Sequence, residues 1–296
     1  MKLATIICYC TNDYRFIDRC ILEAKKFSDQ IIIPVCDHFF NGAPENRMLL
    51  EHTYANHPDC DFIEFAYSPT QLYNPYLNVT PDDEHWMAYW HATSRYVGYL
   101  HLKAEIDWVL FLDCDEIVEG ERFTANVKRA LHCNAVRLSC YYYVLRPDFR
   151  ADKVQDLTLL VQKSALSNFF HPDERYALYR YAPEPKMQGM RGEDSRPLIH
   201  HYSWVRSKEE CLRKAASWGH SRDRDWPKLI EEAFLKKKGK NLFGTELCFK
   251  PVEDVYFDPF SVEVPTKAIG VKNFSHVKRV DHRMIFKMGL EHDALL

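Results

Sequence analysis

The stretch Trp108-Val109-Leu110-Phe111-Leu112-Asp113-Cys114-Asp115 decides how this chain is expected to fold. Five consecutive apolar residues are typical of a β-strand that is buried on both faces. Two carboxylates, separated by one residue, follow this strand directly. A rigid strand that ends in this way can direct the side chains of Asp113 and Asp115 toward one point beyond the sheet.

Outward from this strand, the first half of the chain alternates apolar runs with helical periodicity. Strands are predicted at residues 3–9, 30–36 and 61–65, and helices at about 16–27, 44–55 and 80–100. Such alternation predicts an α/β fold in which a mostly parallel central sheet carries helices on both faces, joined by right-handed crossovers.

The second half of the chain has a less regular pattern. Strands are predicted at residues 135–145, 157–162 and 175–181, and helices at 207–218 and 226–237. We expect residues 1–220 to form one domain. Residues 221–296 are expected to form a helical or irregular extension that packs on the same domain.

Three polar side chains stand where predicted strands end. Thr11 follows the first strand, Asp37 the second and Asp113 the fourth. Ligands of open α/β sheets bind beyond the carboxyl ends of the strands. We therefore expect the functional site at this edge.

Composition and charge exclude several classes of protein. The net charge is −3, so there is no basic excess to bind the phosphates of a nucleic acid. The basic run Lys236-Lys237-Lys238-Gly239-Lys240 is expected to be a solvated helix end, with peripheral contact to a membrane or an anionic acceptor as the alternative. No apolar stretch reaches the roughly 18 residues of a transmembrane helix.

The ten cysteines are scattered and form no CxxC pair. This spacing indicates neither a zinc site nor a disulfide framework. Free thiols and a short apolar N-terminus fit a cytoplasmic protein.

Carboxylates are the ligands that Mg²⁺ and Mn²⁺ prefer. An ion held by Asp113 and Asp115 would act as a Lewis acid and template, and would neutralise the charge that builds on a departing nucleotide diphosphate. The alternative is that the two acids only cap the next helix.

Residues 107–117 resemble the DxD segment of GT-A glycosyltransferases, and most of all the family 2-like enzymes, whose motif often reads W-V-x-x-x-D-x-D-E. A second segment is similar to the H-Y…S-x-E-E…K…G stretch of those proteins. It begins at His200-His201-Tyr202-Ser203-Trp204, continues through Arg206-Ser207-Lys208-Glu209-Glu210 to Lys214, and ends near Gly219. The resemblance covers residues 3–220, and two motifs in order are more specific than either alone.

The resemblance implies a GT-A fold and a metal-dependent transfer of a sugar from a nucleotide-sugar donor. UDP-sugars are expected first, with GDP- and dTDP-sugars behind them. The acceptor would be a hydroxyl of a saccharide or glycoconjugate. We expect inversion at the anomeric carbon, because a nucleotide diphosphate held by a metal departs without a protein acid and one carboxylate base is then enough.

The resemblance also implies the metal ligands and the base. His201 would complete the metal shell of Asp113 and Asp115, while its strand neighbour His200 would face the opposite side. An inverting enzyme needs a carboxylate base within reach of the acceptor hydroxyl. The candidates, in order of preference, are Asp194, Glu193 and then Asp148 or Glu174.

Donor contacts are implied in the same way. The nucleotide would be bordered by Thr11, Asn12 and Asp13, and Asp37 would accept a hydrogen bond from the base or ribose. Arg95 would reach the diphosphate or support Asp113, and Lys214 would contact a phosphate. The alternatives are a turn residue at Asp37 and solvated surface side chains at Arg95 and Lys214. The run Tyr141-Tyr142-Tyr143 either faces an acceptor saccharide or packs in the core.

Two other classes remain as alternatives. A nucleotidyltransferase would usually carry a glycine-rich, basic loop after the first strand, and Cys10-Thr11-Asn12-Asp13-Tyr14 has neither glycine nor lysine. A non-catalytic nucleotide- or sugar-binding protein could also use this fold, because a fold alone does not establish an activity.

Overall fold

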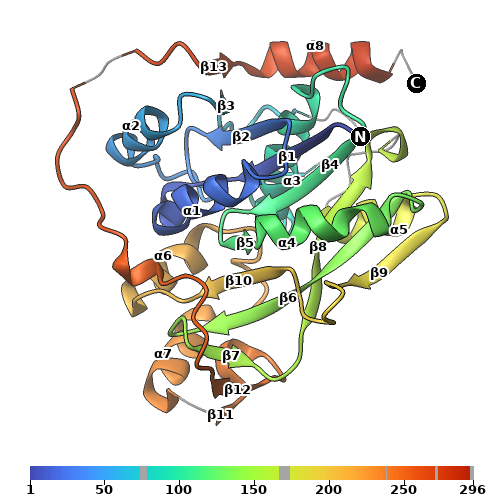
Figure 1. Ribbon diagram of the computed structural model, residues 1–296. Helices are drawn as coiled ribbons and strands as arrows, with labels where there is room; N and C mark the ends of the chain where they lie inside the picture. The colour runs from blue at the N-terminus through green and yellow to red at the C-terminus, as the bar shows by residue number, and fades with distance from the viewer. Residues whose placement is uncertain (74–78, 167–173, 238, 271–272, 294–296) are drawn as a thin grey trace.

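The computed structural model describes residues 1–73, 79–166, 174–237, 239–270 and 273–293. Four parallel strands form the N-terminal half of its central sheet, in the spatial order β3-β2-β1-β4 (Figure 1). They are β1 (Leu3–Cys8), β2 (Gln30–Cys36), β3 (Asp61–Phe65) and β4 (Trp108–Asp113). All four are mostly buried and largely apolar, although β3 also contains Asp61 and Glu64.

Helices cover both faces of these strands. Helices α1 (Tyr14–Ala24) and α2 (Arg47–Asn56) belong to the core on one face, and α3 (Trp86–Leu100) belongs to the core on the other. Neighbouring residues of β1 divide between the two cores, with Ile7 on the α1 side and Ile6 on the α3 side. The predicted α/β class, with a central sheet between two layers of helices, is confirmed.

Helix α3 approaches the sheet closely at Gly98. A Cβ atom added there would lie 2.6 Å from Cγ2 of Ile6. This approach holds the helix, with His91 and Arg95 on it, directly over the end of β4.

The second half of the sheet is mixed. Strand β8 (Gln155–Gln162) runs antiparallel between β4 and β6 (Ala135–Val144), and β10 (Ile199–Trp204) runs parallel to β6. Three short strands complete this half, namely β5 (Glu116–Val118), β7 (Phe149–Ala151) and β9 (Lys186–Met190). The pairing of β5 with β10 brings His201 opposite Glu116, immediately after the acidic motif.

Helices α4 (Gly120–Asn126), α6 (Lys208–Ser217) and α7 (Trp226–Lys236) lie around this half. Helix α6 begins at a capping box, in which the Ser207 side chain accepts from the Glu210 amide and the Glu210 side chain accepts from the Ser207 amide. This start was predicted from the sequence, and it fixes the direction in which Lys214 points.

The C-terminal part of the chain reaches both edges of the sheet (Figure 1). Strands β11 (Gly239–Lys240) and β12 (Cys248–Pro251) extend the sheet beyond β7. Farther along the chain, β13 (Val277–Val280) pairs with β3 at the opposite edge, and α8 (His282–Asp293) follows it. A domain boundary near residue 220 stays a prediction.

Three sequence predictions differ from the structure. The strand predicted at 175–181 is wrong, because Arg175, Leu178 and Ala182 recur at helical spacing and are buried along one side of α5 (Glu174–Tyr181). Helix α2 begins at Arg47 and not at residue 44, since the Asn46 side chain caps it by accepting from the Leu49 amide. Helix α3 begins at Trp86, six residues after the predicted start.

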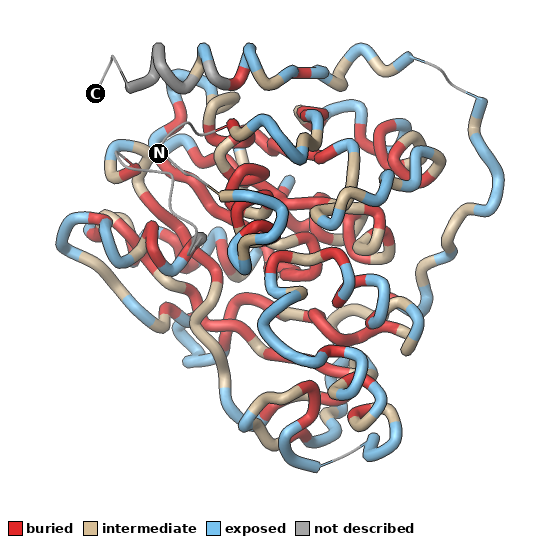
Figure 2. Tube along the Cα trace, turned by 180° about the vertical axis from the view of Figure 1, so that it is seen from behind, coloured by how far each residue is buried: buried red, intermediate tan, exposed pale blue. Residues whose placement is uncertain are grey.

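Burial follows the layers, with the strands at the centre and exposed residues on the outer turns (Figure 2). Among the described residues, no helix has both the length and the apolar character needed to cross a membrane. The basic run begins at the last residue of α7, Lys236, and its Lys238 lies outside the described residues.

Candidate functional site

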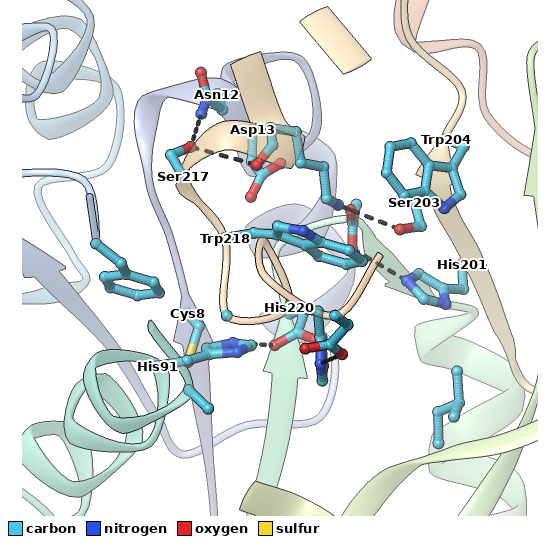
Figure 3. A pocket seen from close by; sticks show the side chains of 18 of the residues that line it. Cys8, Asn12, Asp13, His91, His201, Ser203, Trp204, Ser217, Trp218 and His220 are labelled. Atoms are coloured by element: carbon cyan, nitrogen blue, oxygen red, sulfur yellow. Dashed lines mark hydrogen bonds and ion pairs between the residues drawn. The ribbon is translucent and has the colours of Figure 1, made fainter. Parts of the chain in front are cut away.

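A cavity of about 970 Å³ opens at the carboxyl ends of β1 and β4 (Figure 3). It is therefore at the edge that the strand pattern predicts. Its polar lining includes Asn12, Asp13, Asp113, Asp115, His201, Ser203 and Lys214, which come from the ends of β1 and β4, from β10 and from α6. Segments up to about 200 residues apart in the sequence thus meet at one place.

Asp113 is surrounded by basic side chains. Its Oδ1 lies 2.5 Å from Nη2 of Arg95 and 3.3 Å from Nε2 of His91, and its Oδ2 lies 3.0 Å from Nη2 of Arg175. Burial would raise the pKa of Asp113, but the charges of Arg175 and Arg95 outweigh it and hold the pKa well below its usual value. Asp113 is therefore ionised at neutral pH.

Asp115 is buried and has a similar environment. Its Oδ2 accepts from Nη2 of Arg206 at 2.8 Å and from Nζ of Lys214, while its Oδ1 lies 3.4 Å from Nε2 of His201. Burial would raise the pKa of Asp115, and the charge of Lys214 with the hydrogen bond from His201 holds it well below its usual value. Lys214 also donates to Oγ of Ser203 at 3.3 Å.

Two further acids share these basic groups. Nη2 of Arg206 lies 2.5 Å from Oδ1 of Asp13, and the Arg175 guanidinium contacts Glu116 at 2.6 and 3.0 Å. Asp13, Asp113, Asp115 and Glu116 thus face Arg95, Arg175, Arg206 and Lys214. Arg206 and Lys214 pair with Asp13 and Asp115, and Arg95 and Arg175 pair with Asp113 and Glu116. We call these two neighbouring clusters together the ion-pair network.

Several predicted residues are brought together here. Asn12 lines the cavity, and its Nδ2 donates to Oγ of Ser217 at 2.9 Å. Arg95 is 1% exposed and supports Asp113 from behind, one of the two roles predicted for it. Thr11 does not line the cavity, because its amide and hydroxyl both donate to the carboxylate of Glu45. Burial raises the pKa of Glu45 to about 7.

The two adjacent histidines face opposite sides of β10. His201 points into the cavity, whereas His200 is held by the Tyr143 hydroxyl at 2.9 Å and by Glu119 at 3.0 Å. Of the three neighbouring tyrosines, only Tyr142 lines the cavity.

The structure does not bring the predicted base to this cavity. Asp194 is exposed and lies 2.7 Å from Nε of Arg196 and 2.6 Å from Nη2 of Arg122. The Arg196 hydrogen bond is the main cause that lowers the pKa of Asp194 to about 2. Glu193 is exposed beside it and does not line the cavity either.

Asp148 and Asp37, which were also predicted as site residues, do not line the cavity. Asp148 pairs with Arg146 at 2.9 Å and does not line the cavity. The Glu174 side chain lies outside the described residues. Asp37 lies beside the cavity, where its Oδ1 accepts from the Tyr67 amide at 2.7 Å. Only its neighbours Cys36 and His38 line the cavity.

Sequence reasoning missed His91, Arg175 and Arg206. His91 precedes Arg95 by one helical turn, so the spacing on α3 could have revealed it. Arg206 lies inside the second resembling segment but was given no role. Arg175 was assigned to a strand, and nothing in its local sequence indicates Glu116 as a partner.

The residues do not fit the predicted Mn²⁺ or Mg²⁺. Every carboxylate oxygen of Asp113 and Asp115 faces a basic side chain, so an ion between them would sit among like charges. Within the described ranges, one group of three potential ligands has its atoms within 4.8 Å of one another, namely Cys8, His91 and Asp113. A thiol and an imidazole suit softer ions, and Nη2 of Arg95 already contacts both His91 and Asp113.

No family model and no curated protein matches the sequence. Solved structures that are similar include 4-diphosphocytidyl-2C-methyl-D-erythritol synthase from Anaerococcus prevotii, at 12% identity over 72% of this chain and 97% of that one, with a TM-score of 0.39. S. aureus TarS is 13% identical over 79% of this chain and 71% of that one, with a TM-score of 0.39. The glycosyltransferase GlyE of Streptococcus pneumoniae is 13% identical over 80% and 64%, with a TM-score of 0.35. At these TM-scores the likeness is distant, and the functional argument rests on the cavity.

Proposed function

We propose that this chain is a GT-A-type glycosyltransferase, which moves a sugar from a nucleotide-sugar donor to a hydroxyl of a saccharide or glycoconjugate. UDP-sugars are the first candidates for the donor. The observation that carries the proposal is the meeting of two segments. Asp113-Cys114-Asp115 and the stretch from His201 to Lys214 resemble glycosyltransferase motifs, and both line one cavity at the ends of parallel strands.

The cavity has the size and chemistry for such a donor. Small-molecule sites usually enclose about 300–1,000 Å³, and this one encloses about 970 Å³. Tyr9, Phe40, Tyr142, Trp204 and Trp218 add flat apolar walls, on which a base or a sugar ring can stack. The polar groups are concentrated where the diphosphate would lie, near Asp115 and Lys214.

Transfer requires stabilisation of a departing diphosphate. Preorganised charges in a site that excludes water are the strongest means of providing it. Lys214 is held in place by Asp115 and Ser203, so its ammonium does not need to be ordered during the reaction. We assign to Lys214 the role of binding the diphosphate and stabilising its developing charge.

Transfer also requires a base for the acceptor hydroxyl. Asp194 remains a prediction, and its exposure and two arginine partners do not support it. The cavity offers His201, whose imidazole lies 3.4 Å from Asp115 and is oriented by it. Histidine is the commonest general base, and a carboxylate partner is the usual way of orienting it. Inversion at the anomeric carbon stays a proposal.

A donor screen tests the proposal. The protein would be incubated with UDP-, GDP- and dTDP-sugars, each with Mn²⁺ and with EDTA, and both nucleotide release and thermal shift would be measured. We expect one donor to raise the melting temperature and to release its nucleoside diphosphate. Release of pyrophosphate from a nucleoside triphosphate and a sugar phosphate would instead favour a nucleotidyltransferase. Thermal shift without turnover, across acceptors, would favour a binding protein.

A further inference from the structure

We propose that this protein binds the diphosphate of its donor without a divalent cation, through its own basic side chains and Lys214 above all. The inference rests on the proposed nucleotide donor. It concerns the part of the ligand that a bound metal would otherwise hold.

The first argument is the charge balance of the ion-pair network. Its four carboxylates are matched by four basic side chains, those of Arg95, Arg175, Arg206 and Lys214. A divalent cation added here would lie among like charges with no unpaired carboxylate to offset them, and moving a cation out of water is costly unless it is well paired.

The second argument is the position of the four basic side chains relative to the cavity. Arg206 and Arg95 are 2% and 1% exposed, and they lie behind the acids that they contact. Lys214 and Arg175 line the cavity itself. The acids therefore have cations on the core side and on the cavity side, and those on the cavity side face a ligand.

The third argument is the donor capacity of Lys214. An ammonium group has three N–H donors. Asp115 and Ser203 are the two hydrogen-bond acceptors that the structure gives it, and its side chain is 11% exposed. One donor is thus left for a phosphate oxygen, and a charge-assisted hydrogen bond of this kind is among the strong ones.

It follows that Asp115 acts as a positioning residue for Lys214 and Arg206, and not as a metal ligand. The two roles predict different results for Asp115→Asn. A positioning role weakens nucleotide binding in EDTA, because Lys214 loses its anchor. A metal ligand would leave binding in EDTA unchanged and would remove only the part of the affinity that Mn²⁺ adds.

Calorimetric titration of UDP into the full chain, in EDTA and in Mn²⁺, tests the inference. We expect the two dissociation constants to agree within about threefold. Binding that is tenfold or more tighter in Mn²⁺ would overturn the inference and leave the proposed function intact. If UDP, GDP and dTDP all fail to bind in either condition, the proposed function fails as well.

Two substitutions of Lys214 test whether this side chain binds the diphosphate. Lys214→Met should weaken UDP binding at least tenfold in EDTA, whereas Lys214→Arg, which keeps the charge, should stay within a few-fold. Lys208→Met is the matched control, since Lys208 lies on the same helix and pairs with Glu231 away from the cavity. Equal affinity in Lys214→Met and wild type would refute the assignment. Melting curves show whether each variant is folded.

Direct binding of Mn²⁺ gives a readout that does not depend on the nucleotide. The electron paramagnetic resonance signal of free Mn²⁺ should be unchanged by an equal concentration of the protein. Loss of that signal in wild type, but not in an Asp113→Asn/Asp115→Asn variant, would show a metal site at these acids and would contradict the inference.

Discussion

Replacement of Arg206 by methionine should lower the free energy of unfolding, because it removes a buried cation at the candidate site. Arg206 is 2% exposed, and its Nη2 lies 2.5 Å from Asp13 and 2.8 Å from Asp115. The variant keeps much of the side chain's length but leaves Asp13 without its closest cation. Asp115 retains Lys214 and His201, so most of the cost falls on Asp13.

The size of the effect follows from the burial of the pair. Removal of one partner of a buried ion pair costs about 3–5 kcal/mol. We expect the lower end, about 3 kcal/mol at pH 7, because the Asp13 side chain is 15% exposed. The matched control is Arg196→Met, which removes an exposed partner of Asp194 and should leave stability unchanged within error.

The loss of stability in the Arg206 variant should also depend on pH. Burial already raises the pKa of Asp13, and the Arg206 charge opposes this rise. Without Arg206 the pKa of Asp13 rises further, so the folded variant holds a proton that the unfolded chain releases. Its stability is then highest below the unfolded pKa of about 4 and falls as pH rises through the folded pKa. The deficit relative to wild type should therefore be larger at pH 8 than at pH 5.

Urea unfolding followed by tryptophan fluorescence, at both pH values, measures this deficit. A deficit below about 1 kcal/mol, or one that is equal at pH 5 and pH 8, would refute the assignment of Arg206 as the cation that opposes the rise in the pKa of Asp13.

Three further predictions concern packing, protonation and catalysis. Gly98→Ala should lower the free energy of unfolding by about 1–3 kcal/mol, because the new methyl group would press on Ile6; an unchanged urea midpoint would contradict this. Because the pKa of Glu45 is raised to about 7, the stability of the wild type should fall as pH rises from about 5 toward 8. Glu45→Gln should make this fall smaller. If the melting temperatures of variant and wild type change with pH in parallel, Glu45 is not the cause. His201→Gln should slow turnover by about 10²–10⁴-fold and leave UDP binding within a few-fold, whereas Asp194→Asn should not slow it; the reverse pattern would restore Asp194 as the base.

The sheet was the most predictable part of the fold. Strands at 30–36 and 61–65 were predicted at their observed bounds, because buried strands leave short, largely apolar runs in the sequence. The stretch from Arg175 to Tyr181 was less informative. Its tyrosines fit a strand locally, and the helix forms because its buried side packs in the core beside α3.

The candidate site was predictable where a motif marked it. Asp113, Asp115, His201 and Lys214 meet in one cavity, as the two resembling segments imply. Two of the cations that pair with the acids were not predicted. Arg175 and Arg206 come from α5 and the turn after β10, and only the folding of the chain brings these segments to the acidic motif. Arg95 was predicted as a support for Asp113.

The choice of Asp194 shows a different limit. An acidic pair in a loop looks the same in sequence whether it faces a substrate or binds surface arginines. Arg122 and Arg196 take both oxygens of Asp194, and one of these arginines lies 72 positions away in the chain.

The central claim is that the cavity at the ends of β1 and β4 binds a nucleoside diphosphate beside Lys214. A crystal structure of the protein with UDP, grown in EDTA, tests it most directly. We expect the diphosphate in this cavity, with a phosphate oxygen within about 3 Å of Nζ of Lys214 and the nucleoside toward Asn12. A nucleotide bound at another surface, or a cavity that stays empty at saturating UDP, would contradict the account.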